Sequence, residues 1–312
     1  MESLRLSFEA VMPIFLLMAL GYLLKRLRFA EKSTFDAMNR LVFKIFLPIL
    51  LFYNIYKTDR SQIFNGKLIL FTVVAILAVY GVGYLAVLGL TRDNARRGVM
   101  LQGFFRSNYA ILGIPLVDYV CGDSATGLAS LMVAVVVPLF NILAVICLER
   151  FRNQSVKIGA LLPGILKNPL VIGCLIGAVF LAADLPLPSF VEKAVGNAAQ
   201  IASPLSMVIL GAGFAFSGMR AYRKEIAITV SAKLVIVPLL AVATAVLAGF
   251  RGEALVCILI TFGAPVAVSS FSMSQQMGGD EKLAAQNVVV SSALCLLTLF
   301  GWIFALSALG LI

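Results

Sequence analysis

The sequence predicts an all-α integral membrane protein with ten transmembrane helices, in which a unit of five helices is repeated in inverted orientation. Hydrophobic residues make up 61% of the 312 residues, and only 13% are charged, about half the charged share of a typical soluble domain. The mean hydropathy is +1.01. Apolar stretches fill the whole chain, and a shift of 157 residues superposes features of its two halves. We therefore expect one membrane unit with repeats at residues 1–150 and 151–312.

Ten apolar stretches have the length of roughly 20 residues that a helix needs to cross the hydrocarbon core of a bilayer. Short polar connections separate them, which leaves no room for a soluble domain. The first stretch lacks a basic segment before it and a small-residue cleavage site after it, so we expect it to be retained as a helix. The stretches cover residues 8–27, 35–56, 68–90, 99–120, 128–148, 165–183, 198–216, 226–250, 254–277 and 283–309.

The basic residues between the stretches predict the orientation in the membrane. Lysine and arginine gather on the cytoplasmic side, and fourteen of them lie at one set of helix ends against six at the other. Both termini are therefore predicted to lie outside the cell. The formal net charge of +10 reflects mainly this bias, so we expect no nucleic-acid partner. The cytoplasmic set is Lys25, Arg26, Arg28, Lys32, Arg92, Arg96, Arg97, Arg150, Arg152, Lys157, Arg220, Arg223, Lys224 and Lys282.

The two halves of the chain show signs of an internal repeat. The shift of 157 residues places Lys67 on Lys224 and Asp123 on Asp280. It also sets the polar segment 106–115 of the fourth stretch against segment 263–267 of the ninth. A repeat of five spans must reverse its direction in the membrane. Inverted repeats with helices broken at equivalent places are typical of secondary transporters.

Glycine and proline predict where these two helices break. Proline removes a backbone donor and disfavours a helical residue before it. We therefore expect the fourth span to break at Gly113 and Pro115, and the ninth at Gly263 and Pro265. Each second half-helix would direct its free N–H groups and its positive dipole end toward the middle of the membrane, which favours binding of an anion.

Polar residues beside these breaks predict a site for a carboxylate. Arg106 lies inside the fourth stretch, where a charged side chain is costly and usually functional, and we expect it to be the main anion ligand. Asn108 and the start of the second half-helix of span nine would orient the ligand. Lys44 is expected to be a second positive group, whereas Lys233 is expected to extend to the cytoplasmic interface. The full predicted substrate-binding set is Arg106, Asn108, Lys44, Pro265, Ser269 and Ser270.

Several classes of function are excluded or disfavoured. The chain has no histidine, which excludes Ser-His catalysis, histidine proton relays and two-histidine zinc sites. Its five cysteines lack the spacing of metal ligands, so we expect neither an enzyme nor a metal or cofactor site. A cation or sodium/proton antiporter is disfavoured because no carboxylate lies at mid-span. A passive anion channel remains an alternative, and a coupling ion, sodium or proton, remains open.

Two motifs resemble those of the auxin efflux carrier family, which includes the plant PIN transporters. The fourth-span motif runs from Arg106 to Leu116, and the ninth-span motif, similar to that of bacterial members, runs from Ala264 to Asp280. The resemblance covers nearly the whole chain. It implies ten spans in a five-plus-five inverted repeat like that of bile-acid symporters, a scaffold similar to that of sodium/proton antiporters. Crossing spans four and nine, transport of organic anions and a homodimer are also implied.

The connection between the fifth and sixth stretches departs from the plant members, which carry a long cytoplasmic loop there. In this chain the connection is short and basic. The resemblance therefore favours a prokaryotic protein of the cell membrane, and it favours small mono- or dicarboxylates over auxin as substrates.

The predicted topology can be tested with single cysteines in a cysteine-free background. A cysteine introduced at Asp123 should react with an impermeant thiol reagent from outside the cell. A cysteine introduced at Lys282 should react only after permeabilisation, because it lies among the cytoplasmic bases. Reaction of both from the same side would contradict the inverted repeat.

Overall fold

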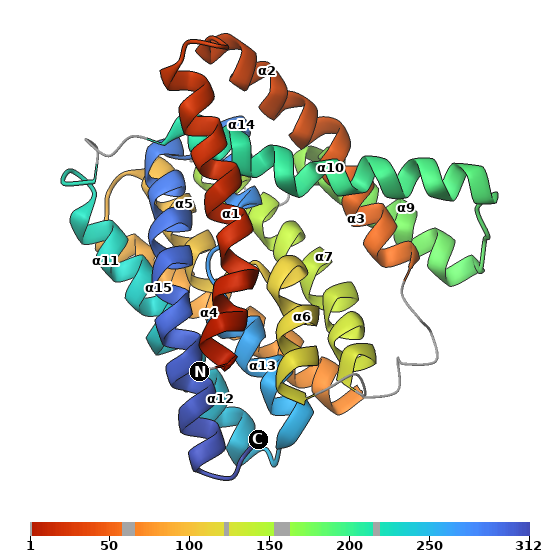
Figure 1. Ribbon diagram of the computed structural model, residues 1–312, viewed down its shortest axis with the longest axis vertical. Helices are drawn as coiled ribbons and strands as arrows, with labels where there is room; N and C mark the ends of the chain where they lie inside the picture. Colours follow the sequence, from red (N-terminus) through yellow and green to blue (C-terminus); the bar gives the residue numbers. More distant parts are fainter. Residues whose placement is uncertain (1, 58–65, 122–124, 153–162, 215–218) are drawn as a thin grey trace.

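The computed structural model describes residues 2–57, 66–121, 125–152, 163–214 and 219–312, and this part of the chain is almost entirely helical (Figure 1). No β-strand occurs among the described residues. The predicted all-α class is therefore confirmed. The elements are α1 (Glu2–Arg26), α2 (Lys32–Leu41), η1 (Val42–Phe46), α3 (Leu47–Tyr56), α4 (Gly66–Leu90), α5 (Asn94–Phe105), α6 (Tyr109–Cys121), α7 (Thr126–Arg152), α9 (Pro169–Ala183), α10 (Ser189–Gly213), α11 (Arg223–Ser231), η5 (Ala232–Ile236), α12 (Val237–Leu247), α13 (Gly252–Gly263), α14 (Ser269–Met277) and α15 (Glu281–Ala308).

Five described helices are long and apolar enough to cross a membrane: Gly66–Leu90, Gly127–Arg152, Ser189–Gly213, Arg223–Leu247 and Glu281–Ala308. One of them joins α11, the π-helical turn η5 and α12 into a single continuous helix. The turn η1 connects α2 to α3 in the same way, because the residues on both of its sides keep right-handed helical backbone angles. The chain is thus a multi-pass membrane protein.

Side-chain caps begin several of these helices. The Asp93 carboxylate accepts hydrogen bonds from the backbone of Ala95 and Arg96 at the start of α5. Asp280 caps α15 in the same way, and Asn168 caps α9 directly before Pro169. Such caps bind N–H groups that have no partner within the helix. The polar residues between the apolar stretches therefore fix where the helices start.

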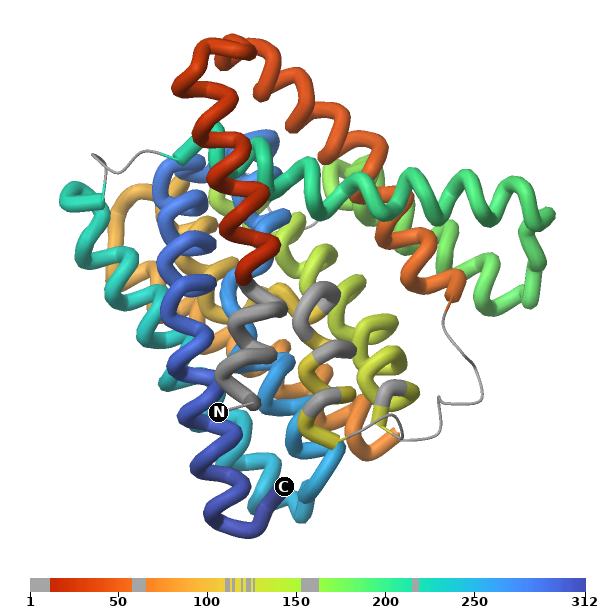
Figure 2. The backbone as a smooth tube through the Cα atoms, in the orientation of Figure 1, coloured from red at the N-terminus to blue at the C-terminus, as the bar shows by residue number. Residues whose placement is uncertain are grey.

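The helices form two bundles. The first bundle consists of α1, α2, η1, α3, α9 and α10, and the second contains α4 to α7 and α11 to α15 with η5. In the first, α1 lies along α10, and α3 lies along α9 and also contacts α10. Figure 2 shows α3, α9 and the N-terminal part of α10 extending away from the remaining helices.

Glycines bring the backbones of the first bundle into direct contact. A Cβ atom added at Gly21 would lie 1.8 Å from the carbonyl oxygen of Val208, and one at Gly211 would lie 1.9 Å from that of Met18. On the other pair of helices, a Cβ at Gly173 would lie 2.5 Å from the carbonyl oxygen of Pro48. Small residues allow this close helix packing where lipid provides no hydrophobic driving force.

The helix bounds follow the spacing of 157 residues found in the sequence. This shift carries residues 32–56, from the start of α2 to the end of α3, onto Ser189–Gly213, the bounds of α10. It also carries Gly66–Leu90 onto Arg223–Leu247. The two halves thus have matching helix lengths. Their inverted orientation stays a prediction.

The break in the fourth span lies one to two turns before its predicted position. Helix α5 ends at Phe105 and α6 begins at Tyr109, so Gly113 and Pro115 both lie inside α6. The prediction of a break at these two residues is wrong, because the helix stops where Arg106 turns to extended backbone angles and the chain pairs with the ninth span. Gly113 instead makes room for a ring: an added Cβ would lie 2.7 Å from the ring of Tyr109.

The break in the ninth span lies where the sequence places it. Helix α13 ends at Gly263, α14 begins at Ser269, and Pro265 stands between them. The backbone of Ala264 is extended. Pro265 follows this extended residue and cannot continue the helix, so the first half-helix ends at Gly263.

Because of the glycine contact between α1 and α10, a Gly→Leu substitution in this contact should destabilise the protein more than the same substitution on α4. Gly211→Leu should lower the melting temperature in detergent by at least several degrees, because overpacking costs about 1–3 kcal/mol or more. Gly81→Leu on α4 is the matched control, since an added Cβ there meets nothing within 4 Å. Thermal denaturation followed by size-exclusion chromatography measures both, and equal losses would argue against a tight α1–α10 contact.

Candidate functional site

The two helix breaks meet and pair with each other. Ser107 and Val266 form an antiparallel bridge, and the backbone N–H of Asn108 donates to the carbonyl of Pro265 over 2.8 Å. The N–H of Val266 donates to the hydroxyl of Ser291 on α15 over 3.0 Å. Backbone groups without partners are very costly in a membrane. The pairing of the two segments therefore stabilises both breaks.

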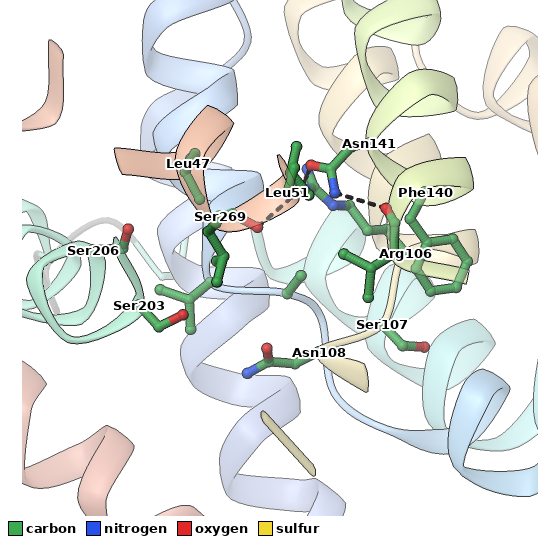
Figure 3. Close-up of a pocket in the computed structure, with 14 residues that line it drawn as sticks. Leu47, Leu51, Arg106, Ser107, Asn108, Phe140, Asn141, Ser203, Ser206 and Ser269 are labelled. Carbon is green, nitrogen blue, oxygen red and sulfur yellow. Dashed lines mark hydrogen bonds between the residues drawn. The ribbon is translucent and has the colours of Figure 1, made fainter. Parts of the chain in front are cut away.

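The side chains of the extended segment, residues 106–108, point to two sides. The hydroxyl of Ser107 points away from Asn108 (Figure 3); it donates to the carbonyl of Thr261 and accepts from the ammonium of Lys233. Arg106 and Asn108 line the cavity where the two breaks meet, and Ser107 also contributes to its lining. This division follows from extended backbone, in which successive side chains alternate in direction.

Arg106 is buried, with 2% of its surface exposed, and its guanidinium is held by neutral groups. One terminal nitrogen donates to Asn141 Oδ1 over 2.6 Å and to Ser269 Oγ over 2.9 Å. The other donates to Gln102 Oε1 over 3.1 Å and lies 2.7 Å from the sulfur of Met273. Figure 3 shows Arg106 beside Asn141. The guanidinium is thus positioned by four neighbours that leave its charge uncompensated.

Within the described part of the chain, the ion pairs do not include Arg106, and no aspartate or glutamate lines the cavity beside it. A buried charge without a partner is strongly unfavourable. The place where the two breaks meet therefore holds a buried positive charge with no acidic partner among the described residues.

The cavity next to Arg106 has a volume of about 50 Å³, enough for a few water molecules. Leu51 of α3 and Ser203 and Ser206 of α10 line it from the first bundle. The second bundle contributes Asn141 of α7 and Ser269 of α14. The site thus lies at the boundary of the two bundles, and it is narrow in this conformation.

Two of the predicted residues carry unused hydrogen-bonding groups. The Nδ2 group of Asn108, a residue only 6% exposed, has no partner among the described residues. The hydroxyl of buried Ser270 is likewise unpartnered there, although Ser270 is not among the lining residues. Buried donors are rarely left unsatisfied. The Asn108 amide is therefore a candidate donor to a ligand in the cavity.

Two lysines lie in surroundings opposite to those predicted from the sequence. Lys44 is exposed on η1 and does not line the cavity, so its predicted place in the site is wrong. Lys233 does not extend to the interface; it is 0% exposed, and its ammonium donates to Ser107. Both lysines lie in π-helical turns. Such turns insert a residue and change the direction of the side chains relative to an α-helix, which the sequence did not reveal.

Sequence reasoning missed Gln102, Asn141 and Met273, which all contact Arg106. Gln102 stands one helical turn before Arg106, a spacing that places both side chains on one face. Asn141 is an amide within the apolar span 128–148, which is itself a signal of function. Met273 carried no comparable signal.

Comparisons with known proteins show which proteins this chain resembles. Residues 6–303 match the family described as "Membrane transport protein". A Rhizobium meliloti protein provisionally named a malonate transporter is 24% identical over 303 residues, which cover 94% of each chain. Uncharacterized transporters from Methanothermobacter thermautotrophicus and Escherichia coli are 23% and 24% identical, over 95% and 94% of this chain and 97% and 96% of their own.

The neutral surroundings of Arg106 predict an unusual effect on stability. Asn141→Asp should raise the melting temperature in detergent, because a carboxylate would replace a neutral acceptor 2.6 Å from the guanidinium and charge-assisted hydrogen bonds are stronger. Asn141→Leu should lower it, because it removes the acceptor. If Asn141→Asp destabilises the protein as much as Asn141→Leu, then Arg106 is already neutralised.

Proposed function

The chain belongs to the family of membrane transport proteins that its motifs predicted, the auxin efflux carrier family, and we propose that it is a secondary transporter of small organic anions. It would move mono- or dicarboxylates across the cell membrane of a prokaryote by alternating access. The observation that carries this proposal is the buried guanidinium of Arg106, whose contacts in the described structure are all neutral.

Arg106 would bind the carboxylate through two N–H groups, a geometry that suits guanidinium and carboxylate, and the ligand would replace the weaker contacts to Gln102 and Met273. Ser269 and Asn141 fix one end of the guanidinium, so that little side-chain freedom is lost on binding. The free amide group of Asn108 would donate to a ligand oxygen. A ligand would thus supply a negative charge to Arg106 and an acceptor to the Asn108 amide.

Two further sources of positive potential support anion binding. Helix α14 begins at Ser269 beside the cavity, without a side-chain cap among the described residues. The positive end of its dipole therefore lies at the ligand position. Lys233, and not Lys44, would be the second positive group of the site. It would act through its hydrogen bond to Ser107, the residue between Arg106 and Asn108.

The substrate class follows from this chemistry and from one relative. A site with one fixed arginine, neutral donors and no lining carboxylate among the described residues suits a small carboxylate and not a cation. This observation disfavours cation/proton antiport. The name of the Rhizobium meliloti relative makes malonate the first substrate to test.

Alternating access would result from movement of one bundle against the other. The cavity is lined from both bundles, so a relative shift would open it to one side and then to the other. A five-plus-five inverted repeat with crossing spans four and nine would provide the two equivalent conformations. Termini outside the cell, a homodimer and a coupling ion, sodium or proton, complete the proposal.

The proposal predicts a graded loss of malonate binding. Arg106→Gln should abolish detectable binding, whereas Arg106→Lys should keep weak binding, because the charge remains but the bidentate geometry is lost. Asn108→Ala should cost on the order of 1–3 kcal/mol, and Lys233→Met should weaken binding without abolishing it. Thermal stabilisation of the purified protein by malonate measures affinity, and Lys44→Gln is the matched control, which should bind like the native protein.

Native affinity in Arg106→Gln would exclude this residue as the anion ligand. Counterflow of labelled malonate in proteoliposomes separates a carrier from a channel, because a carrier exchanges substrate in a saturable manner. Absence of saturable counterflow in a protein that binds malonate would favour the passive channel.

A further inference from the structure

A group of polar contacts joins the two bundles on the side of the predicted cytoplasm. Asn39 of α2 is completely buried, and its amide donates to the side-chain oxygen of Gln275 on α14 and to the carbonyl of Ser272 over 3.4 Å. The amide of Gln275 donates in turn to Asp36 over 3.0 Å and to Glu281 over 2.9 Å. We call these four side chains, Asp36, Asn39, Gln275 and Glu281, the α2–α14 clasp.

The α2–α14 clasp borders a second cavity. This cavity has a volume of about 170 Å³, more than three times that of the cavity beside Arg106. Three lysines, one aspartate and one glutamate contribute to its lining. It is lined by Lys25, Lys32, Phe35, Asp36, Ile209, Ala212, Gly213, Phe271, Gln275, Glu281 and Lys282.

The two cavities follow one another along the same pair of helices. On α10, Ser206 lines the cavity beside Arg106 and Ile209 lines the second one. On α14, Ser269 lines the first cavity and Gln275 lines the second, a separation of about 9 Å along the helix at 1.5 Å per residue. The boundary between α10 and α14 therefore leads from the cavity beside Arg106 toward the face of the protein that is predicted to be cytoplasmic.

Phe271 lines the second cavity, on the side of the Arg106 cavity that faces the predicted cytoplasm. Its ring is buried and lies against α10, where a Cβ added at Gly213 would be 3.0 Å from the ring. The α2–α14 clasp holds α14, which carries Phe271, against α2 of the first bundle. Breaking the clasp would allow the bundles to part at this point.

We propose that the α2–α14 clasp is the inner gate, which closes the Arg106 cavity toward the cytoplasm with the ring of Phe271. This assignment rests on the proposed transport function for its role, but its geometry can be tested without any substrate. The clasp suits a gate because it consists of a few side-chain hydrogen bonds, and Asn39 Oδ1 has no partner among the described residues. Its opening would break these hydrogen bonds and the ion pair of Lys32 with Glu281, whose charged atoms lie 3.9 Å apart.

The test measures access to a reporter cysteine, Ser203→Cys, which lines the Arg106 cavity on α10. In a cysteine-free background, an impermeant maleimide is applied to inverted vesicles, which expose the cytoplasmic face. Labelling should be slow in this background and about tenfold faster with Asn39→Ala or Gln275→Ala, because either change shifts the population toward the open state. The matched control is Asn197→Ala, since Asn197 is an exposed amide on α10.

A second measurement covers the case in which Asn39→Ala fails to fold. In an Asn39→Cys/Gln275→Cys double variant, a short bis-methanethiosulfonate should stop malonate counterflow, and a reductant should restore it. Faster labelling without malonate transport would keep the gate and reject the proposed substrate. Unchanged labelling in folded Gln275→Ala, or faster labelling only from the opposite face, would overturn the gate.

Discussion

Two helix breaks inside a membrane leave backbone groups that neither water nor lipid can satisfy, and the structure depends on how they are satisfied here. Ser107 and Val266 pair directly, and Asn108 donates to Pro265. Each broken span thus provides the partners that the other lacks. The pairing fixes the position of the extended segment, and it thereby fixes where the side chains of Arg106 and Asn108 lie.

The contacts within the first bundle differ in kind from those between the bundles. Backbone meets backbone at Gly21 and Gly211, and such contacts tolerate almost no displacement because interiors are close-packed. Between the bundles, the α2–α14 clasp provides polar side-chain contacts beside the packing of α1 against α15 and α6. A relative movement would break the second kind of contact and keep the first. This difference favours motion of the two bundles as units.

The sequence predicted the membrane class, the helical fold and the family, because these depend on composition and on local patterns. It also identified Arg106, Asn108 and Ser269, which the structure brings to one cavity. It misplaced the break at Gly113 and Pro115, since the rule for proline is local whereas the position of the break depends on pairing with Pro265 and Val266 in the ninth span. The sequence predicted Lys44 in the site and Lys233 at the interface, the reverse of what the structure shows, because π-helical turns are not visible in a hydrophobic pattern.

The directions of the side chains of residues 106–108 explain why the site needs an extended segment and not a kinked helix. In a helix, neighbouring side chains point about 100° apart, so residues 106 and 108 would diverge. Extended backbone places Arg106 and Asn108 at the cavity, while the hydroxyl of Ser107, which also contributes to the lining, bonds to Lys233 and Thr261. The buried lysine thus contributes its charge from behind the segment without occupying the cavity. A ligand would meet one guanidinium, one amide and the start of α14, with the second positive charge beyond its reach.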